Sequence, residues 1–123
     1  MIMEFNDNEP LYIQVADYLE SEILDGKYEM GSKVPSVREL AAELVINGRT
    51  VQNAITRLVE SGLVETRRGL GNFVTTDQEK IQRIRRNKIT AMTETFVKNS
   101  LAFVSIAELQ DILTQVVSQY KKG

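Results

Sequence analysis

The stretch from Ser36 to Val74, SVRELAAELVINGRTVQNAITRLVESGLVETRRGLGNFV, decides the fold of this chain. It opens with Ser36 followed three residues later by Glu39, a capping box in which each side chain satisfies a free backbone N–H of the other residue. Apolar residues then recur at helical spacing, so the sequence predicts a short helix over about residues 36–44.

A further helix follows after only a few residues. Asn47 is a favourable helix cap, and the apolar residues from Val51 to Val59 form a stripe that ends at Gly62, a typical helix terminator. Two helices joined by so short a turn are typical of a helix-turn-helix motif.

Two β-prone runs come next, separated by a loop with two glycines. The runs are LVET (residues 63–66) and NFVTT (residues 72–76), and the loop between them is RRGLG (residues 67–71). Glycine readily adopts positive φ at the tip of a tight turn, so we expect a β-hairpin here. A hairpin directly after a helix-turn-helix makes a winged helix.

Helical patterns flank this stretch on both sides. Pro10 can begin a helix that ends near residue 25, and Val34 in the following connector is a candidate for a short strand. We therefore predict a mostly α-helical chain with a small β-hairpin. In it, residues 1–76 form a winged helix-turn-helix domain and residues 77–123 form a C-terminal two-helix hairpin.

The C-terminal hairpin is expected to contain two amphipathic helices without a core of their own, the second opened by a capping box of Ser105 and Glu108. Such a small hairpin would expose a large apolar surface, so we expect it to pair with its copy in a homodimer. The residues expected at this contact are Ile89, Met92, Phe96, Ile106, Leu109, Leu113 and Val116. No volume for a pocket of ~300 Å³ is evident in the tail, so a small-molecule effector is not evident from the sequence.

The composition argues against catalysis. The chain has no histidine and no cysteine, which removes the commonest general base, the commonest metal ligands and any disulfide. We therefore expect no enzyme activity, no cofactor and no metal. There is also no basic leader and no apolar run of ~18 residues, so we expect a cytoplasmic protein that does not engage a membrane.

Charge is distributed unevenly along the chain. Residues 1–76 contain 7 Lys/Arg and 12 Asp/Glu, whereas residues 77–123 contain 8 and 5. Between Gly31 and Thr76, however, basic residues outnumber acidic ones by 6 to 4. An anion-binding face must therefore be built in that segment or beyond it.

Residues 10–74 resemble the winged-helix domain of GntR-type bacterial transcription regulators over their whole length. Three segments carry the resemblance in the order and spacing of that family: GSKVPSVRELA, the TV that opens the recognition helix, and LVESGLVETRRGLGNFV. The short tail is similar to that of the YtrA subfamily, in which a helical hairpin replaces a large effector domain and builds a homodimer. The resemblance implies a DNA-binding transcription regulator, with repression as the usual mode.

The resemblance also implies which residues contact DNA. Arg38 matches a DNA-contacting arginine, and the residues from Asn47 to Thr50 match the start of the recognition helix. Arg can bind guanine, and Asn or Gln can bind adenine, through paired hydrogen bonds in the major groove, so Arg49, Gln52 and Asn53 are the expected readers. The expected DNA-binding residues are Lys33, Ser36, Arg38, Asn47, Gly48, Arg49, Thr50, Gln52, Asn53, Arg67, Arg68 and Gly69.

The loop between the two strands is the expected wing tip, where Arg68 and Gly69 match family residues that reach the minor groove. A narrow minor groove concentrates negative potential and attracts an inserted arginine. The sequence does not decide whether Arg67 or Arg68 enters the groove.

Two departures from the family pattern bear on these expectations. Val45 stands where the turn between the two helices usually has a glycine, and Gly48 stands where many members have Arg or Pro. Because Gly48 has no side chain to read a base, the readout of better-known members need not transfer to this chain.

Two functions from different classes remain open on the sequence alone. The first is a sequence-specific regulator, expected to act as a homodimeric repressor on a palindromic operator. The second is a winged-helix protein-interaction module without specific DNA readout, whose acidic N-terminal half docks a basic partner.

Overall fold

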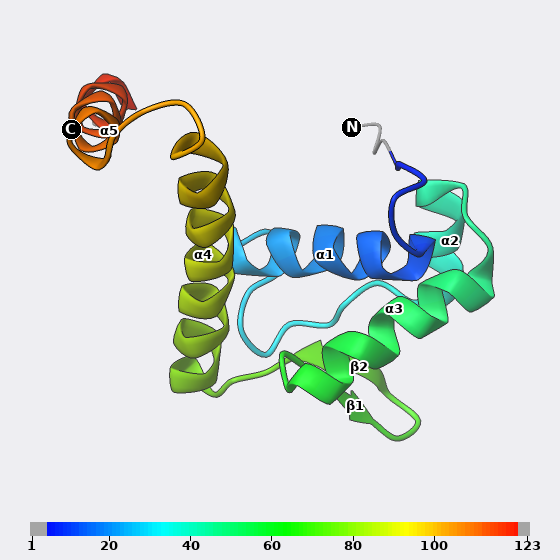
Figure 1. Cartoon of the computed structure of the whole chain (residues 1–123). Helices are drawn as coiled ribbons and strands as arrows, with labels where there is room; N and C mark the ends of the chain where they lie inside the picture. Colours follow the sequence, from blue (N-terminus) through cyan, green and yellow to red (C-terminus); the bar gives the residue numbers. More distant parts are fainter. Residues whose placement is uncertain (1–4, 121–123) are drawn as a thin grey trace. The chain divides into compact units, whose positions relative to one another are not determined.

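The structure is a computed structural model that describes residues 5–120 of the chain. Residues 1–4 of the predicted winged helix-turn-helix domain and residues 121–123 of the predicted C-terminal hairpin lie outside the described residues. The elements are α1 (Leu11–Leu24), α2 (Val37–Leu44), α3 (Gly48–Ser61), β1 (Val64–Arg67), β2 (Gly71–Val74), α4 (Gln78–Ser100) and α5 (Ile106–Tyr120) (Figure 1). The predicted winged helix followed by a two-helix tail is confirmed.

The chain divides into two compact units, one ending at Arg85 and the other beginning at Arg86. The first turns of α4 belong to the first unit, because the side chain of Ile81 is buried in its core. The domain boundary that the sequence suggests, between residues 76 and 77, stays a prediction.

The core of the first unit forms where α1 packs on α3. Val15, Leu19, Val51 and Ile55 are at most 1% exposed, so each helix buries one apolar stripe and leaves its other faces polar. This burial, at ~1.5–3 kcal/mol for each large side chain, is the main stabilising contribution. It holds α3 rigidly between α2 and the hairpin, both of which α3 contacts.

The hairpin is widened by the connector that precedes α2. β1 and β2 pair antiparallel, with Val64 opposite Val74 and Arg67 opposite Gly71. On the outer side of β2, the Val34 N–H donates to the Asn72 carbonyl at 2.8 Å. The short strand expected at Val34 is present as a single antiparallel bridge between Lys33 and Phe73. The wing therefore has three extended segments.

Val45 adopts a left-handed backbone conformation, with φ of 55° and ψ of 52°, at the end of α2. It is the one residue other than glycine with positive φ among residues 5–120, and its side chain is 87% exposed. This conformation is rare for a β-branched residue and costs ~1–2 kcal/mol. The family that the sequence resembles usually has glycine at this point, and glycine adopts positive φ without this cost. Val45 therefore departs from the family pattern at the expense of backbone strain.

We therefore expect Val45→Gly to raise the free energy of unfolding by about 0.5–1 kcal/mol. The relief of the left-handed strain exceeds the ~0.4–1 kcal/mol that glycine adds to the entropy of the unfolded chain. Urea-induced unfolding would measure the change. Val45→Ala serves as the control, because it keeps most of the strain, and a Val45→Gly protein no more stable than Val45→Ala would contradict the explanation.

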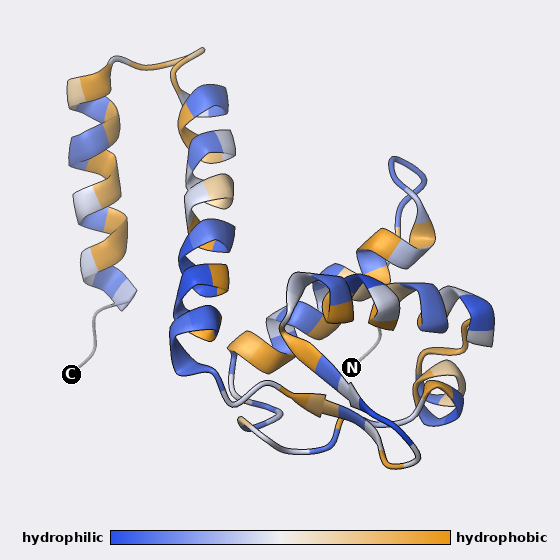
Figure 2. Ribbon diagram, turned by 90° about the horizontal axis from the view of Figure 1, so that it is seen from below, coloured by the Kyte–Doolittle hydropathy of each residue, from blue (hydrophilic) through white to orange (hydrophobic). Residues whose placement is uncertain are grey.

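The second unit contains most of α4 and all of α5. Apolar side chains recur along α5 and along the later turns of α4, as the orange bands in Figure 2 show. Among these, Leu109 is buried, whereas Met92, Phe96 and Leu113 stay 46–60% exposed. The two helices thus leave much of their apolar surface uncovered within one chain.

Candidate nucleic-acid interface

The outward side of α3 carries an uninterrupted polar stripe. Arg49, Gln52, Asn53 and Thr56 are exposed, because the intervening apolar residues of the same helix are buried against the core. The spacing of three and four residues places these four side chains on one side of the helix. The Nε2 atom of Gln52 donates to Thr56 Oγ1 at 3.3 Å. A recognition helix presents such a polar stripe to the base edges in the major groove.

The start of α3 is capped from within the turn. The Asn47 side chain accepts a hydrogen bond from the Arg49 N–H at 2.8 Å, which confirms Asn47 as the cap. A Cβ atom at Gly48 would have its nearest contact, Val37 Cγ1, at 3.9 Å, so packing would permit a side chain there. Thr50 is only half-exposed, which leaves it less available than Arg49 to a ligand.

Helix α2 begins with the predicted capping box, which is confirmed. The Glu39 N–H donates to Ser36 Oγ at 3.1 Å, and the Ser36 N–H donates to Glu39 Oε1 at 2.9 Å. The backbone hydrogen bond from Ser36 lowers the pKa of Glu39. The resulting stabilisation is present above the ordinary carboxyl pKa and is lost as the pH falls through the lowered value.

Arg38 follows this cap on the exposed side of α2. Its guanidinium makes no ion pair within 4 Å in the part of the chain that the structure describes, and the neighbouring Glu39 is engaged in the cap. An exposed arginine that no carboxylate neutralises is available to a phosphate or a guanine.

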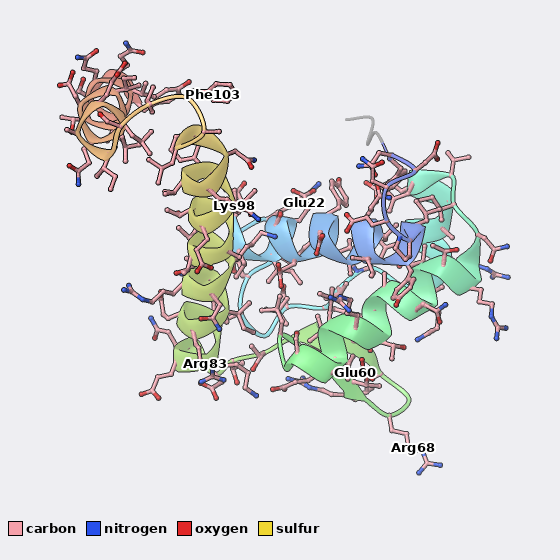
Figure 3. All side chains as sticks on the ribbon, in the orientation of Figure 1. Glu22, Glu60, Arg68, Arg83, Lys98 and Phe103 are labelled. Carbon is pink, nitrogen blue, oxygen red and sulfur yellow. The ribbon has the colours of Figure 1, made fainter. Side chains whose placement is uncertain are left out.

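The two wing arginines are placed differently. The Arg67 Cζ atom lies 4.2 Å from the centroid of the Phe73 ring, over the hairpin. Arg68 instead extends from the tip of the loop into solvent, as Figure 3 shows. Gly69 and Gly71 adopt φ of 77° and 118°, so the loop requires the glycines that the sequence supplies. Arg68 is the free side chain of the pair.

The structure thus gathers the predicted residues onto α2, the first half of α3 and the wing, with α3 in contact with the other two elements. Two residues that take part in this arrangement were not among those expected. Thr56 accepts a hydrogen bond from Gln52, and the Phe73 ring lies under the Arg67 guanidinium. The signal for Thr56 was its position four residues after Gln52, on the same side of the helix.

The tail carries an apolar groove within the second unit. It has a volume of about 550 Å³ and is lined by Ile89, Met92, Thr93, Phe96, Val97, Leu101, Ile106, Leu109, Gln110 and Leu113. Six of the seven residues expected at a dimer contact belong to this lining, whereas Val116 does not, although it is 43% exposed. The expectation that the tail has no volume of ~300 Å³ is wrong, because the apolar sides of α4 and α5 leave a groove of about 550 Å³ between them.

Neither a membrane span nor a metal-binding cluster is found in the part of the chain that the structure describes. None of its helices is both long and apolar enough to cross a membrane. Within the same residues, no three His, Cys, Asp or Glu side chains are grouped so as to hold a metal ion.

Comparison with known proteins gives agreement over the winged helix and over nearly the whole chain. The family model of bacterial regulatory proteins, gntR family, matches residues 11–74. The HTH-type transcriptional repressor YtrA of Bacillus subtilis (strain 168) is 28% identical over 118 residues, which cover 93% of this chain and 89% of YtrA. The solved structure of a GntR family transcriptional regulator from Listeria monocytogenes has 33% identity and a TM-score of 0.83, covering 90% of this chain and 98% of that one.

A further solved structure has DNA bound. AraR(DBD) in complex with operator ORX1 is similar to this chain with a TM-score of 0.55 and 29% identity, over 61% of this chain and 95% of that one. The similarity thus includes a protein whose structure was determined on its operator.

Proposed function

Because the chain belongs to the GntR family of bacterial transcription regulators, which bind DNA, we propose that it is a homodimeric repressor that recognises a palindromic operator. The observation that carries the proposal is the exposed polar stripe of α3, which begins at the capped first turn and contains Arg49, Gln52 and Asn53. In a helix-turn-helix, the residues at the start of the second helix reach the base edges of the major groove.

Within this stripe, Arg49 has the chemistry to read guanine, and Gln52 and Asn53 have the chemistry to read adenine. Arg38 on α2 and the capped turn at Asn47 would hold the helix in register through phosphate contacts, which position a protein without specifying a sequence. Gly48 contributes no side chain, so the readout rests on Arg49, the next residue, and on Gln52 and Asn53, one turn further along α3.

Arg68 is the arginine that we assign to the minor groove. It extends from the wing tip beside Gly69, whereas Arg67 is held over Phe73. An exposed guanidinium next to a glycine at a loop tip fits the narrow, negatively charged groove beside a recognition helix.

The apolar groove between α4 and α5 supports the homodimer. Apolar side chains that are 46–60% exposed along both helices are removed from water when a second copy packs against them. Two recognition helices related by a two-fold axis read half-sites ~34 Å apart, which is why the operator is expected to be palindromic. Repression is proposed because YtrA, similar over nearly the whole chain, is a repressor.

The proposal is tested by fluorescence anisotropy with the purified protein and the intergenic DNA upstream of its own gene, against an unrelated duplex, across a salt series. We expect a preference of a hundredfold or more that persists at physiological salt. Binding without preference, erased by salt, would contradict the proposal and favour the protein-interaction module. A pull-down with the acidic N-terminal half as bait would then be the next experiment.

Arg68→Ala is expected to lower the slope of log affinity against log salt by about 0.9, because one phosphate-linked charge is lost from the contact with DNA. The variant should keep the preference for the bases that α3 reads in the major groove. Lys98→Ala, which removes an exposed positive charge from the last turn of α4, is the matched control and should leave the slope unchanged. Equal slopes for the two variants would remove Arg68 from the interface.

A further inference from the structure

The solvent side of the three-segment wing carries two positively charged side chains, those of Lys33 and Arg67. Alternation along the strands places Glu65, Arg67, Gly71 and Phe73 on one side of the hairpin, opposite the buried Val64 and Val74. Lys33 is paired with Phe73 from the neighbouring segment and so joins the same side. Arg67 on β1 and Lys33 on the connector therefore lie on the two neighbours of β2, one on each side of that strand.

The aromatic ring of Phe73 contacts the guanidinium of Arg67. The guanidinium carbon lies 4.2 Å from the ring centroid, the distance of a cation–π contact. The ring limits the rotamers of a side chain that would otherwise be free on an exposed strand. The guanidinium is thereby held over the wing with its N–H groups in solvent.

Gly71 makes room for Lys33. A Cβ atom at Gly71 would lie 2.8 Å from Lys33 Cε and 3.6 Å from its Nζ, so the lysine stem occupies the space that the missing side chain leaves. Gly71 is also the residue paired with Arg67 in the register of the hairpin. The Lys33 side chain therefore lies against Gly71, and the Arg67 guanidinium lies over Phe73, two residues further along the same side of β2.

No carboxylate in residues 5–120 lies within 4 Å of either charge. Glu65, on the same side of the hairpin, accepts a hydrogen bond from Thr75 Oγ1 at 2.9 Å. Two like charges on the same side of the wing without an ion-pair partner repel one another, and an anion bound by both offsets that repulsion. Arg and Lys with free donors are the usual partners of a phosphodiester oxygen.

We propose that Lys33 and Arg67 form a phosphate clamp on the solvent side of the wing, and that Phe73 and Gly71 are its positioning residues. The ligand is a backbone phosphate of duplex DNA, so the inference rests on the proposed function. The clamp holds the wing against the backbone while Arg68 enters the groove. Because it contacts only phosphate, its contribution is independent of base sequence.

The test is a double-mutant cycle with Phe73→Leu and Arg67→Ala, measured by anisotropy on the upstream duplex and on an unrelated duplex. Phe73→Leu should weaken binding about threefold on both duplexes, because the apolar contact is kept and only the aromatic face is lost. Phe73→Tyr should restore the affinity. In the Arg67→Ala background, Phe73→Leu should have no further effect, and Arg67→Ala itself should lower the salt slope by about 0.9.

Gly71→Ala supplies a second, independent arm of the experiment. The added methyl displaces Lys33, and it also strains the loop because Gly71 has a φ of 118°. The part of the affinity loss that comes from Lys33 should therefore disappear in the Lys33→Ala background, whereas the part that comes from strain should remain. Thermal unfolding of each variant separates a loss of binding from a loss of fold. The clamp is overturned if Phe73→Leu binds like the unchanged protein, or if its effect persists without Arg67. If both cycles behave as expected while the upstream duplex is not preferred, the clamp stands and the specific repressor fails.

Discussion

Arg49→Ala is expected to lower affinity for the operator by on the order of ten- to a hundredfold and to abolish the preference for one base in each half-site. A bidentate arginine–guanine contact is worth ~1–3 kcal/mol of discrimination. Arg49 is exposed in the first turn of α3, and its backbone N–H is fixed by the Asn47 side chain. The hydrogen bond to Asn47 therefore fixes the backbone from which the Arg49 side chain extends. The variant should lose affinity for the operator far more than affinity for unrelated DNA.

The measurement compares the variant and the unchanged protein on a set of duplexes that differ by single base pairs. Arg49→Lys is the control, since it keeps the positive charge but cannot make two parallel hydrogen bonds to guanine. We expect Arg49→Lys to retain non-specific affinity and to lose the base preference. An Arg49→Ala protein with its base preference intact would remove Arg49 from the readers and leave Gln52 and Asn53.

Local signals were sufficient for most of the fold. The Ser36–Glu39 box, the Asn47 cap and the Gly62 terminator each depend on a few adjacent residues, and each is present in the structure. The polar side of α3 also follows from helical spacing alone, once the buried side is known. The positions of the expected reader residues could therefore be predicted before any tertiary contact was known.

Features that depend on register or packing could not be predicted in this way. The contact between Arg67 and Phe73 exists because Phe73 pairs with Glu65 and not with a residue one step away, a choice that the run RRGLG does not reveal. The groove in the tail depends on how α4 and α5 pack against one another, which the pattern of either helix alone does not reveal. The sequence shows that Val45 departs from the family pattern, but the strain in its backbone follows only from the positive φ in the structure.

Met92→Asp is expected to convert the protein to a monomer and to lower its affinity for the full operator by ~10²–10⁴-fold. Met92 lines the apolar groove of the tail and is 60% exposed, so a carboxylate there is tolerated by a single chain. It would be buried without a partner at a contact between two copies, which is strongly unfavourable. Once the dimer is lost, the second half-site no longer binds as an intramolecular event.

Light scattering would report the oligomeric state, and anisotropy on the full operator and on a single half-site would report binding. Ala91→Asp is the matched control, because Ala91 is exposed on the same helix next to Met92 but does not line the groove. It should remain dimeric. Both variants should bind an isolated half-site as the unchanged protein does, since the winged helix is untouched. A Met92→Asp dimer, or a monomer that still binds the full operator tightly, would show that the tail is not what joins the two recognition helices.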